Sequence, residues 1–248
     1  MLKIKNLHKS FDGVHAVDDF SLTIAPRTIT SIIGPNGAGK TTVFNIVTGF
    51  LQADSGIITF DGKNIYSQAA WKITRSGISR TFQQVRLLKK MTVLENILIG
   101  MQNQSGERVL NALFRHSSTS AEVKKHREKA EEWLRFIGLS EYRDTFTENL
   151  SYGQQKLVSV ACALATEPKL LLLDEPVSGV QPEMIRNIES KLRELVKKNL
   201  TIVLIEHDME FVGRVSDTIV VMDEGKKIAS GTPSEIRNNP QVLEAYLS

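Results

Sequence analysis

Residues Gly34–Thr42 read GPNGAGKTT, a stretch that matches the pattern G-x-x-x-x-G-K-[ST]. The preceding run Thr28–Ile33 (TITSII) is rich in β-branched residues and predicts a buried strand. After the glycines, apolar residues recur at helical spacing from Val43 to Val47. A strand, a glycine-rich loop and a helix therefore follow one another, which predicts an α/β fold with the loop at the end of a strand.

The residue types of this loop predict a phosphate site. Gly34, Gly37 and Gly39 allow positive φ angles, so that consecutive N–H groups can point inward at an anion. Lys40 adds a full positive charge for the β and γ phosphates, and the Thr41 hydroxyl suits a hard cation such as Mg²⁺. A glycine-rich turn without a ligand is the alternative, and the flanking strand and helix argue against it.

Composition and charge restrict the class of protein. The chain has 248 residues, 41% of them hydrophobic, which excludes a fully disordered protein. A balance of 31 basic against 28 acidic residues, a net charge of +3, does not predict a nucleic-acid partner. One cysteine, Cys162, permits no internal disulfide, and the first residues contain no apolar signal core. We therefore expect a cytosolic chain, with any membrane span supplied by another subunit.

The hydrophobic pattern changes along the chain. Residues 2 to about 65 alternate as strands do, with a hairpin turn at Asp61-Gly62, and predict an antiparallel β region. From about 86 to 167 the pattern is helical and predicts an inserted α-helical subdomain. The segment from Lys72 to Lys90 carries basic residues and no acid, which predicts a solvated face or one that meets lipid headgroups or an acidic loop of a partner: Lys72, Arg75, Arg80, Arg86, Lys89 and Lys90.

The last third returns to strands and helices. Leu170–Leu173 and Thr201–Ile205 predict parallel strands beside that of the loop, separated by a helix from about Glu183 to Lys198. The following sequence TIVVMDEGKKIASG predicts a hairpin that turns at Glu224-Gly225.

A second motif, LLLLDEP, ends the strand that begins at Leu170. Its two carboxylates emerge where α/β sheets place ligands, and neighbouring residues of a strand point in opposite directions. Asp174 is therefore the candidate magnesium partner, and Glu175 is the candidate general base that orients an attacking water. An exposed acidic turn is the alternative, which the phosphate loop makes less favoured.

A third motif, LSYGQ, precedes the second. Ser151 and Gln154 can form a capping box at the start of a helix. The same serine hydroxyl, the Gly153 N–H and the helix N-terminus can instead form a second anion site.

Together these motifs resemble those of ATP-binding-cassette (ABC) ATPases, the nucleotide-binding subunits of transporters. GPNGAGKTT is similar to the Walker A motif, LSYGQ to the signature motif and LLLLDEP to the Walker B motif. Gln83 in RTFQQ matches the Q-loop glutamine, SGVQP matches the D-loop, and His207 in VLIEHDM matches the switch histidine. The resemblance covers essentially the whole chain. It implies a P-loop NTPase (RecA-like) core with an N-terminal antiparallel β subdomain and the inserted helical subdomain.

The resemblance also implies a role for each residue. Glu175, His207, Lys40 and Gln83 would be catalytic, and Thr41, Gln83 and Asp174 would hold Mg²⁺. Taken alone, Gln83 could be a solvated loop residue and His207 a structural histidine. Phe11, which falls where the family places an aromatic ring against adenine, could simply pack in the core. The residues matched to ATP binding are Phe11, Gly34, Pro35, Asn36, Gly37, Ala38, Gly39, Lys40, Thr41 and Thr42.

In this family two copies face each other head to tail. Each ATP would lie between the Walker A motif of one cassette and the signature motif Ser151, Tyr152, Gly153 and Gln154 of the other. The D-loop residues Ser178, Gly179, Val180 and Gln181 would lie between the two sites. The implied partners are a second cassette, identical or not, integral membrane permease subunits and an extracytoplasmic substrate-binding protein. Such a cassette would be peripheral on the inner face of the cell membrane.

Further segments, among them RTFQQVRLLKKMTVLENI and the ending EAYLS, resemble the uptake cassettes for branched-chain or other hydrophobic amino acids. Urea or amide importers and lipopolysaccharide-export cassettes share much of this pattern, so they stay as alternatives. A nucleotide-switched interaction module without turnover is an alternative of another class, against which the intact catalytic residues argue. DNA-repair cassettes would need a long coiled-coil insertion, which this sequence lacks.

Overall fold

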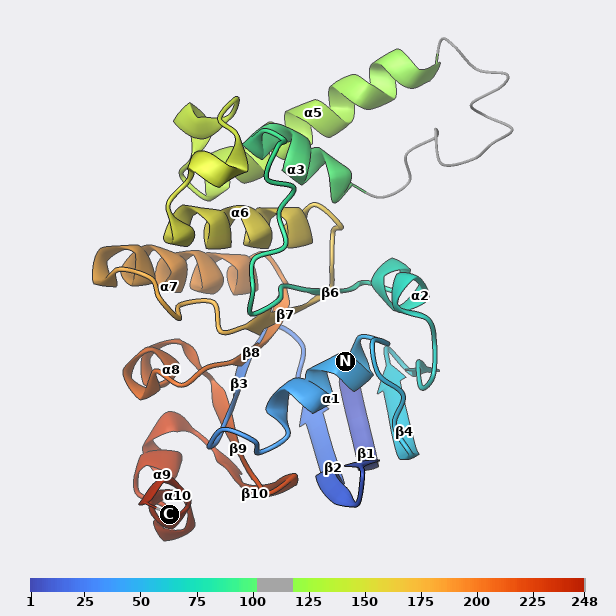
Figure 1. The fold of residues 1–248 in the computed structure, drawn as a ribbon, viewed down its shortest axis with the longest axis vertical. Coiled ribbons are helices and arrows are strands. Elements are labelled where there is room, and N and C mark those ends of the chain that lie inside the picture. Colours follow the sequence, from blue (N-terminus) through green and yellow to red (C-terminus); the bar gives the residue numbers. More distant parts are fainter. Residues whose placement is uncertain (102–117, 248) are drawn as a thin grey trace. The chain divides into compact units, whose positions relative to one another are not determined.

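A computed structural model describes residues 1–101 and 118–247 (Figure 1). The chain divides into two compact units, of which the first comprises Met1–Gln83 and Lys169–Ser248 and the second comprises Gln84–Pro168. The first unit contains β1 (Leu2–Phe11), β2 (Val14–Ile24), β3 (Ile29–Ile33), α1 (Lys40–Val47), β4 (Ser55–Phe60), β5 (Lys63–Asn64), α2 (Ala70–Arg75), β6 (Ile78–Arg80), β7 (Leu170–Asp174), α7 (Pro182–Lys197), β8 (Thr201–Ile205), α8 (Met209–Val215), β9 (Thr218–Asp223), β10 (Lys226–Gly231), α9 (Pro233–Arg237) and α10 (Pro240–Leu247). The second unit contains α3 (Val93–Ile99), α5 (Ser118–Phe136), the 3₁₀ helices η2 (Ser140–Tyr142) and η3 (Thr147–Asn149), and α6 (Tyr152–Leu164).

Two sheets build the first unit. One is antiparallel with the strand order β2-β1-β4-β5, and the other has the order β10-β9-β3-β8-β7-β6. In the second sheet, β3 pairs in parallel with β8 and β9, and β7 pairs in parallel with β8 and β6. The prediction of parallel strands beside the loop strand is thereby confirmed, as is the α/β fold class with an antiparallel region at the N-terminus.

The central strands are short and apolar. All five residues of β3, β7 and β8 are buried, as expected of parallel strands covered on both faces. Because these strands are parallel, their carboxyl ends meet at one edge of the sheet. The phosphate loop follows β3, the LLLLDEP carboxylates end β7, and His207 follows β8. The topology thus gathers three separate motifs at one edge.

Both predicted hairpin turns are present. Asp61 and Gly62 have φ angles of 47° and 79°, and Glu224 and Gly225 have φ angles of 43° and 79°. Two consecutive positive φ angles suit the tight turns that match the right-handed twist of the strands. The sequence pattern did not predict that β9, besides pairing with β10, also joins the parallel sheet beside β3.

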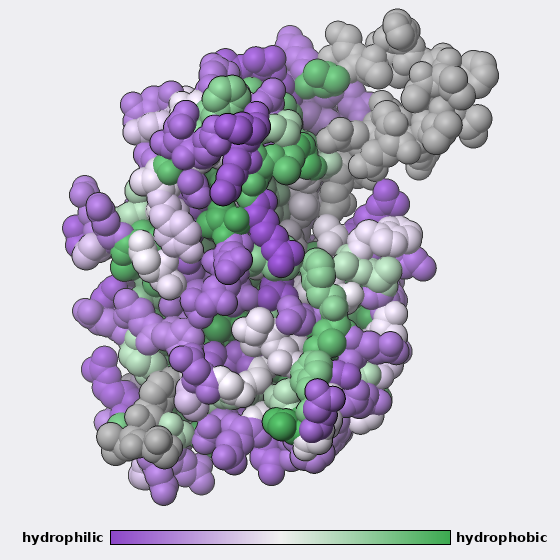
Figure 2. All heavy atoms as spheres, viewed as in Figure 1, coloured by the Kyte–Doolittle hydropathy of each residue, from purple (hydrophilic) through white to green (hydrophobic). Residues whose placement is uncertain are grey.

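One apolar core joins the two sheets of the first unit. Side chains from β1, β2 and β4 share it with α1 and with β7, β8 and β9; Phe20 and Phe44 are among its largest buried members. The face shown in Figure 2 is mostly hydrophilic, with hydrophobic side chains in small groups. Within residues 1–101 and 118–247, no helix is long and apolar enough to cross a membrane.

Helices make up the second unit. Two of them begin with complete capping boxes, Thr92 with Glu95 in α3 and Ser151 with Gln154 in α6. Each box satisfies backbone N–H groups that a helix start otherwise leaves without partners.

Candidate functional site

The phosphate loop runs from the end of β3 to the start of α1. Gly34, Gly37 and Gly39 have φ angles of 147°, 86° and 93°. A Cβ atom at Gly34 would lie 1.9 Å from the Met222 carbonyl oxygen, and one at Gly39 would lie 2.1 Å from the Ala16 carbonyl oxygen. Glycine is therefore required at both positions by the neighbouring backbone as well as by its φ angle.

The β9–β10 turn supports this loop from the side. The Gly225 N–H donates to the Ala38 carbonyl at 3.3 Å, and the Asp18 N–H of β2 donates to the Gly225 carbonyl at 2.9 Å. The loop is thus held between β2 and a hairpin that comes much later in the chain.

Lys40, the first residue of α1, is almost fully buried. Its Nζ donates to the carbonyl oxygens of Gly34 at 2.8 Å and Pro35 at 2.7 Å, so the ammonium lies inside the curve of the loop. Burial lowers the pKa of Lys40, and the negative charges of Glu175 and Asp174 partly oppose this effect. The Lys40 ammonium therefore lies within the electrostatic reach of both Walker B carboxylates.

Glu175 and His207 meet at the carboxyl edge of the parallel sheet. The Glu175 Oε1 atom lies 3.3 Å from the His207 Nε2 atom. Glu175 has a left-handed backbone with φ of 49°, and its N–H donates to the Ile205 carbonyl at 3.0 Å. Such a conformation of a residue with a side chain is uncommon and is found at functional sites. The structure thus brings together two of the predicted catalytic residues.

Glu206, which none of the sequence motifs assigns a role, positions this edge. Its side chain is buried, and Oε1 accepts from the Val177 N–H at 2.8 Å while Oε2 accepts from the His207 N–H at 3.0 Å. One carboxylate therefore ties the segment after Glu175 to the segment that carries His207. The only signal in the sequence was an acidic residue directly after a buried strand.

Within the basic run, the structure corrects the prediction for Arg80 alone; the other five residues are exposed. Arg80 belongs to that run, but its side chain is only 5% exposed and forms an ion pair with Asp174, whose side chain is 2% exposed. Because β6 lies beside β7 in the sheet, the end of β6 directs Arg80 to the end of β7. The exposed residues Lys72 and Arg75 instead lie near the ring of Trp71.

Gln83 and Phe11 are both accessible. Gln83 is exposed and follows Thr81, whose Oγ1 accepts from the Asp174 N–H at 3.3 Å, so the Q-loop segment begins beside the Walker B strand. Phe11 ends β1 and is 45% exposed, which is more than a core aromatic would show. The Lys9 ammonium lies 5.2 Å from its ring centroid.

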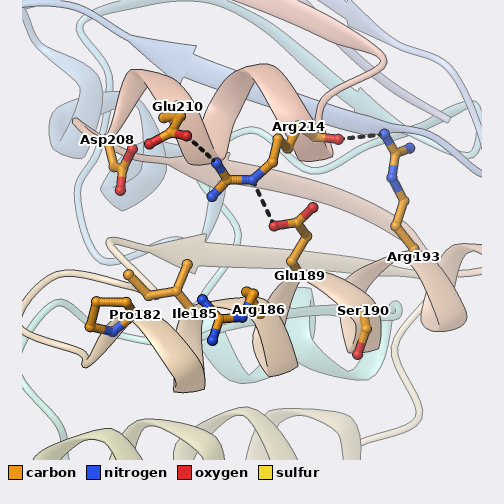
Figure 3. Close-up of a pocket in the computed structure, with 9 residues that line it drawn as sticks. All are labelled: Pro182, Ile185, Arg186, Glu189, Ser190, Arg193, Asp208, Glu210 and Arg214. Carbon is orange, nitrogen blue, oxygen red and sulfur yellow. Dashed lines mark hydrogen bonds and ion pairs between the residues drawn. The ribbon is translucent and has the colours of Figure 1, made fainter.

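The D-loop leads directly into α7. Ser178 and Gly179 are exposed, and Gln181 occupies the N-cap position without a side-chain cap bond. A cleft of about 620 Å³ lies between α7 and α8 (Figure 3). Across it, the Arg214 side chain joins Glu189 of α7 to Glu210 of α8, with both distances 2.9 Å. The Arg214–Glu189 pair links the helix after the D-loop to the helix after His207, whereas the Arg214–Glu210 pair lies within α8.

The signature residues lie in the second unit. The Ser151 Oγ accepts from the Gln154 N–H at 3.3 Å, and the Ser151 N–H donates to Gln154 Oε1 at 2.9 Å. The predicted capping box is thereby confirmed. Ser151 and Tyr152 are exposed, with the Lys156 ammonium 5.3 Å from the Tyr152 ring centroid.

Comparison with known proteins decides the family. The family model described as "ABC transporter" matches residues 17–178, and the model "Branched-chain amino acid ATP-binding cassette transporter" matches residues 226–247. The chain belongs to the ABC transporter family. It is an ABC-type ATPase subunit that binds ATP, which confirms the resemblance of its motifs.

Similarity to individual proteins extends over the full length. The chain is 40% identical to the "High-affinity branched-chain amino acid transport ATP-binding protein BraF" of Pseudomonas aeruginosa, over 100% of this chain and 97% of that protein. It superposes with a TM-score of 0.87 on a nucleotide-free ATP-binding cassette from an ABC transporter, with 40% identity and coverage of 100% and 99%. A dimeric, post-hydrolysis cassette bound to ADP and Pi is 25% identical, with a TM-score of 0.78 and coverage of 94% and 99%.

Proposed function

We propose that this chain is the ATP-hydrolysing subunit of an importer of branched-chain or other hydrophobic amino acids. Two features of the comparisons support the substrate class: the similarity to BraF over the whole chain and the match of residues 226–247 to a model specific to branched-chain amino acid cassettes. The close approach of Glu175 and His207 at the sheet edge that carries the phosphate loop is the observation that supports hydrolysis at this site.

In this proposal the phosphate loop binds the triphosphate of ATP. The N–H groups of residues 36–42 surround the phosphate oxygens, and the Lys40 ammonium moves from the loop carbonyls to the β and γ phosphates. Phe11, exposed at the end of β1, stacks on adenine.

The oxygen donors near the loop fit Mg²⁺. Thr41 offers an exposed hydroxyl, Gln83 an exposed amide and Asp174 a buried carboxylate, all of them hard ligands. Among the residues that the structure describes, no group of three or more His, Cys, Asp or Glu side chains could hold a metal. A magnesium site here would therefore depend on the phosphates of ATP, as is usual for this ion. The ion supplies neutralisation of charge on the β and γ phosphates.

Hydrolysis then needs a base beside the γ phosphate. Glu175 is proposed to take a proton from the attacking water. Its carboxylate is largely shielded from solvent, and Glu175 directly follows Asp174, the proposed magnesium carboxylate. His207 lies against the same carboxylate and is proposed to orient it and the γ phosphate. Lys40 stabilises the charge that develops on the phosphate oxygens.

The active assembly is proposed to be a head-to-tail dimer. Ser151 and the N-terminus of α6 would bind the γ phosphate held by the partner cassette, and residues 178–181 would lie between the two sites. A membrane permease, an extracytoplasmic substrate-binding protein and a position on the inner face of the cell membrane complete the proposal. The similarity to a dimeric cassette bound to ADP and Pi supports the dimeric arrangement.

Replacement of Glu175 by Gln tests the base assignment. We expect Glu175→Gln to bind ATP normally, to lose about 10²- to 10⁴-fold in hydrolysis and to accumulate as an ATP-bound dimer, because the amide cannot accept the proton. ATP binding by fluorescence, phosphate release and light scattering measure these three quantities. Glu183→Gln, an exposed change in the first turn of α7, is the matched control and should behave as the wild type. Normal turnover by Glu175→Gln would remove the base assignment.

Uptake by the assembled transporter tests the substrate class. We expect the complex isolated with its membrane subunits to carry radiolabelled leucine into vesicles when ATP is supplied. Uptake of urea or short amides, with no uptake of leucine, would overturn the assignment to hydrophobic amino acids.

A further inference from the structure

Arg80 is a buried cation beside the Walker B carboxylate; it begins the RTFQQ stretch, but none of the motif assignments gives it a role. Its Nη2 donates to Asp174 Oδ2 at 2.6 Å, and both side chains are almost fully buried. This hydrogen bond uses Oδ2 of Asp174, and the Asp174 backbone N–H donates to Thr81 Oγ1. One carboxylate oxygen is thus held by a charge-assisted hydrogen bond, the strongest kind that a side chain makes.

The same guanidinium is anchored to the helix that follows the phosphate loop. Nη1 donates to Asn45 Oδ1 at 2.7 Å and to Thr48 Oγ1 at 3.3 Å. The rings of Phe44 and Phe82 lie 5.5 and 5.1 Å from its Cζ atom. Arg80 therefore has a fixed place against α1, and its planar fork presents Nη2 to Asp174 in one orientation.

We propose that Arg80 is a positioning residue for Asp174: it holds Oδ2 so that Oδ1 stays free for a water of the magnesium ion. The proposal rests on the magnesium site proposed above. A carboxylate rotates about its Cβ–Cγ bond with a broad preference, so a single anchored oxygen decides where the other one points. Asn45 lies in α1, and Thr48 is the C-cap residue of that helix. Because α1 begins at Lys40, the Arg80 anchor also fixes the position of the Asp174 carboxylate relative to the phosphate loop.

A purely structural ion pair would behave differently. Loss of either partner of a buried pair destabilises a protein, whatever its role in metal binding. A positioning role adds a specific consequence: the gain in ATP affinity that Mg²⁺ provides should shrink, while ATP binding without metal, which depends on the loop, should not change.

The experiment compares wild type with Arg80→Met and Arg80→Lys. The Kd of a fluorescent ATP analogue is measured in EDTA and in excess Mg²⁺, and the ratio of the two values gives the benefit from magnesium. We expect this ratio to fall about tenfold to a hundredfold in Arg80→Met, in keeping with the loss of one charge-assisted hydrogen bond, with the Kd in EDTA unchanged. Arg80→Lys keeps the charge but cannot reach Asp174 and Asn45 together, so its ratio should also fall.

Stability is measured in parallel. Arg80→Met should lower the Tm by roughly 10 °C, because Asp174 is left buried without a partner. The double variant Arg80→Met/Asp174→Asn should recover part of this loss, since it removes the unpaired charge. If Arg80→Met does not fold, Arg80→Lys alone decides the question.

Lys169→Met is the matched control. Lys169 forms an ion pair with Asp61 at 3.0 Å beside the start of β7, and the two side chains are 64% and 37% exposed. Its removal should leave the magnesium benefit unchanged. If the gain in ATP affinity from Mg²⁺ is unchanged in both Arg80 variants, the proposal is overturned. A larger gain would also overturn it, because it would mean that Arg80 only competes with the metal for Asp174. A wild type without any magnesium benefit would instead refute the magnesium site itself.

Discussion

Replacement of Gly39 by Ala measures how firmly the phosphate loop is held by the neighbouring backbone. Gly39 has φ of 93°, and a Cβ atom there would lie 2.1 Å from the Ala16 carbonyl oxygen. Gly62, in the β4–β5 turn, has φ of 79°, and a Cβ atom there would meet no other atom within 4 Å. The two substitutions share the same change in side chain and nearly the same φ angle, so Gly62→Ala is the matched control.

The expected cost follows from two contributions. Left-handed backbone costs an alanine about 1–2 kcal/mol in either variant. The smaller conformational freedom of alanine in the unfolded chain returns about 0.4–1 kcal/mol in both, and therefore cancels from the comparison. Relief of the overlap with Ala16 requires the loop or β2 to shift, which costs about 1–3 kcal/mol more in Gly39→Ala alone. For a chain of this size the Tm of Gly39→Ala should be lower than that of Gly62→Ala by roughly 2–12 °C.

Thermal denaturation and ATP binding test this comparison. A displacement of the loop also moves N–H groups that face the phosphates, and a misplacement of about 1 Å can cost on the order of a hundredfold at a reacting centre. We therefore expect Gly39→Ala to weaken ATP binding strongly and Gly62→Ala to leave it unchanged. Equal Tm values and equal Kd values for the two variants would show that the Ala16 backbone does not confine the loop.

Three other predictions concern the same site. Burial lowers the pKa of Lys40, so the affinity for ATP should fall with rising pH before the ordinary lysine pKa of 10.5 is reached. Over the same pH interval the contribution of Lys40 to the free energy of unfolding should rise, because the unfolded chain still binds the proton that the folded chain has lost. Lys40→Met should abolish both effects in pH titrations of the Kd for ATP and of the free energy of unfolding. Glu206→Ala leaves the buried N–H of Val177 and the part-buried N–H of His207 without their acceptor and should cost about 2–4 kcal/mol in urea unfolding. Glu206→Gln, which keeps one acceptor, should cost less, and equal values would contradict the bridging role. Ser151→Arg should abolish turnover and leave ATP binding intact, as measured by phosphate release and fluorescence, and loss of binding would contradict a role for Ser151 on the partner's ATP.

Local patterns predicted much of the first unit. Short apolar runs predicted β7 and β8, and the helix expected from about Glu183 to Lys198 is α7, Pro182–Lys197. Tight-turn dipeptides predicted both hairpins, because positive φ angles restrict the residue types that a turn accepts. These features depend on residues that are near one another in the sequence.

Short elements and long-range partners escaped prediction. β6 spans only Ile78–Arg80 and is too short for a periodic pattern, so Arg80 looked like one more member of a solvated basic run. Its burial depends on β6 lying beside β7, which is a property of the strand order. Glu206 likewise gained its role only when β8 and β7 became neighbours, so that one carboxylate could reach both Val177 and His207.

Binding of a nucleoside triphosphate follows from the sequence alone, because the φ preferences of Gly34, Gly37 and Gly39 and the charge of Lys40 belong to the residues themselves. Which side chains act with that loop depends on the folded chain. Glu175 meets His207, and Arg80 meets Asp174, because parallel strands distant in the chain end at one edge of the sheet. Residue chemistry is local, whereas a pairing across strands exists only after the chain has closed the long loops between them.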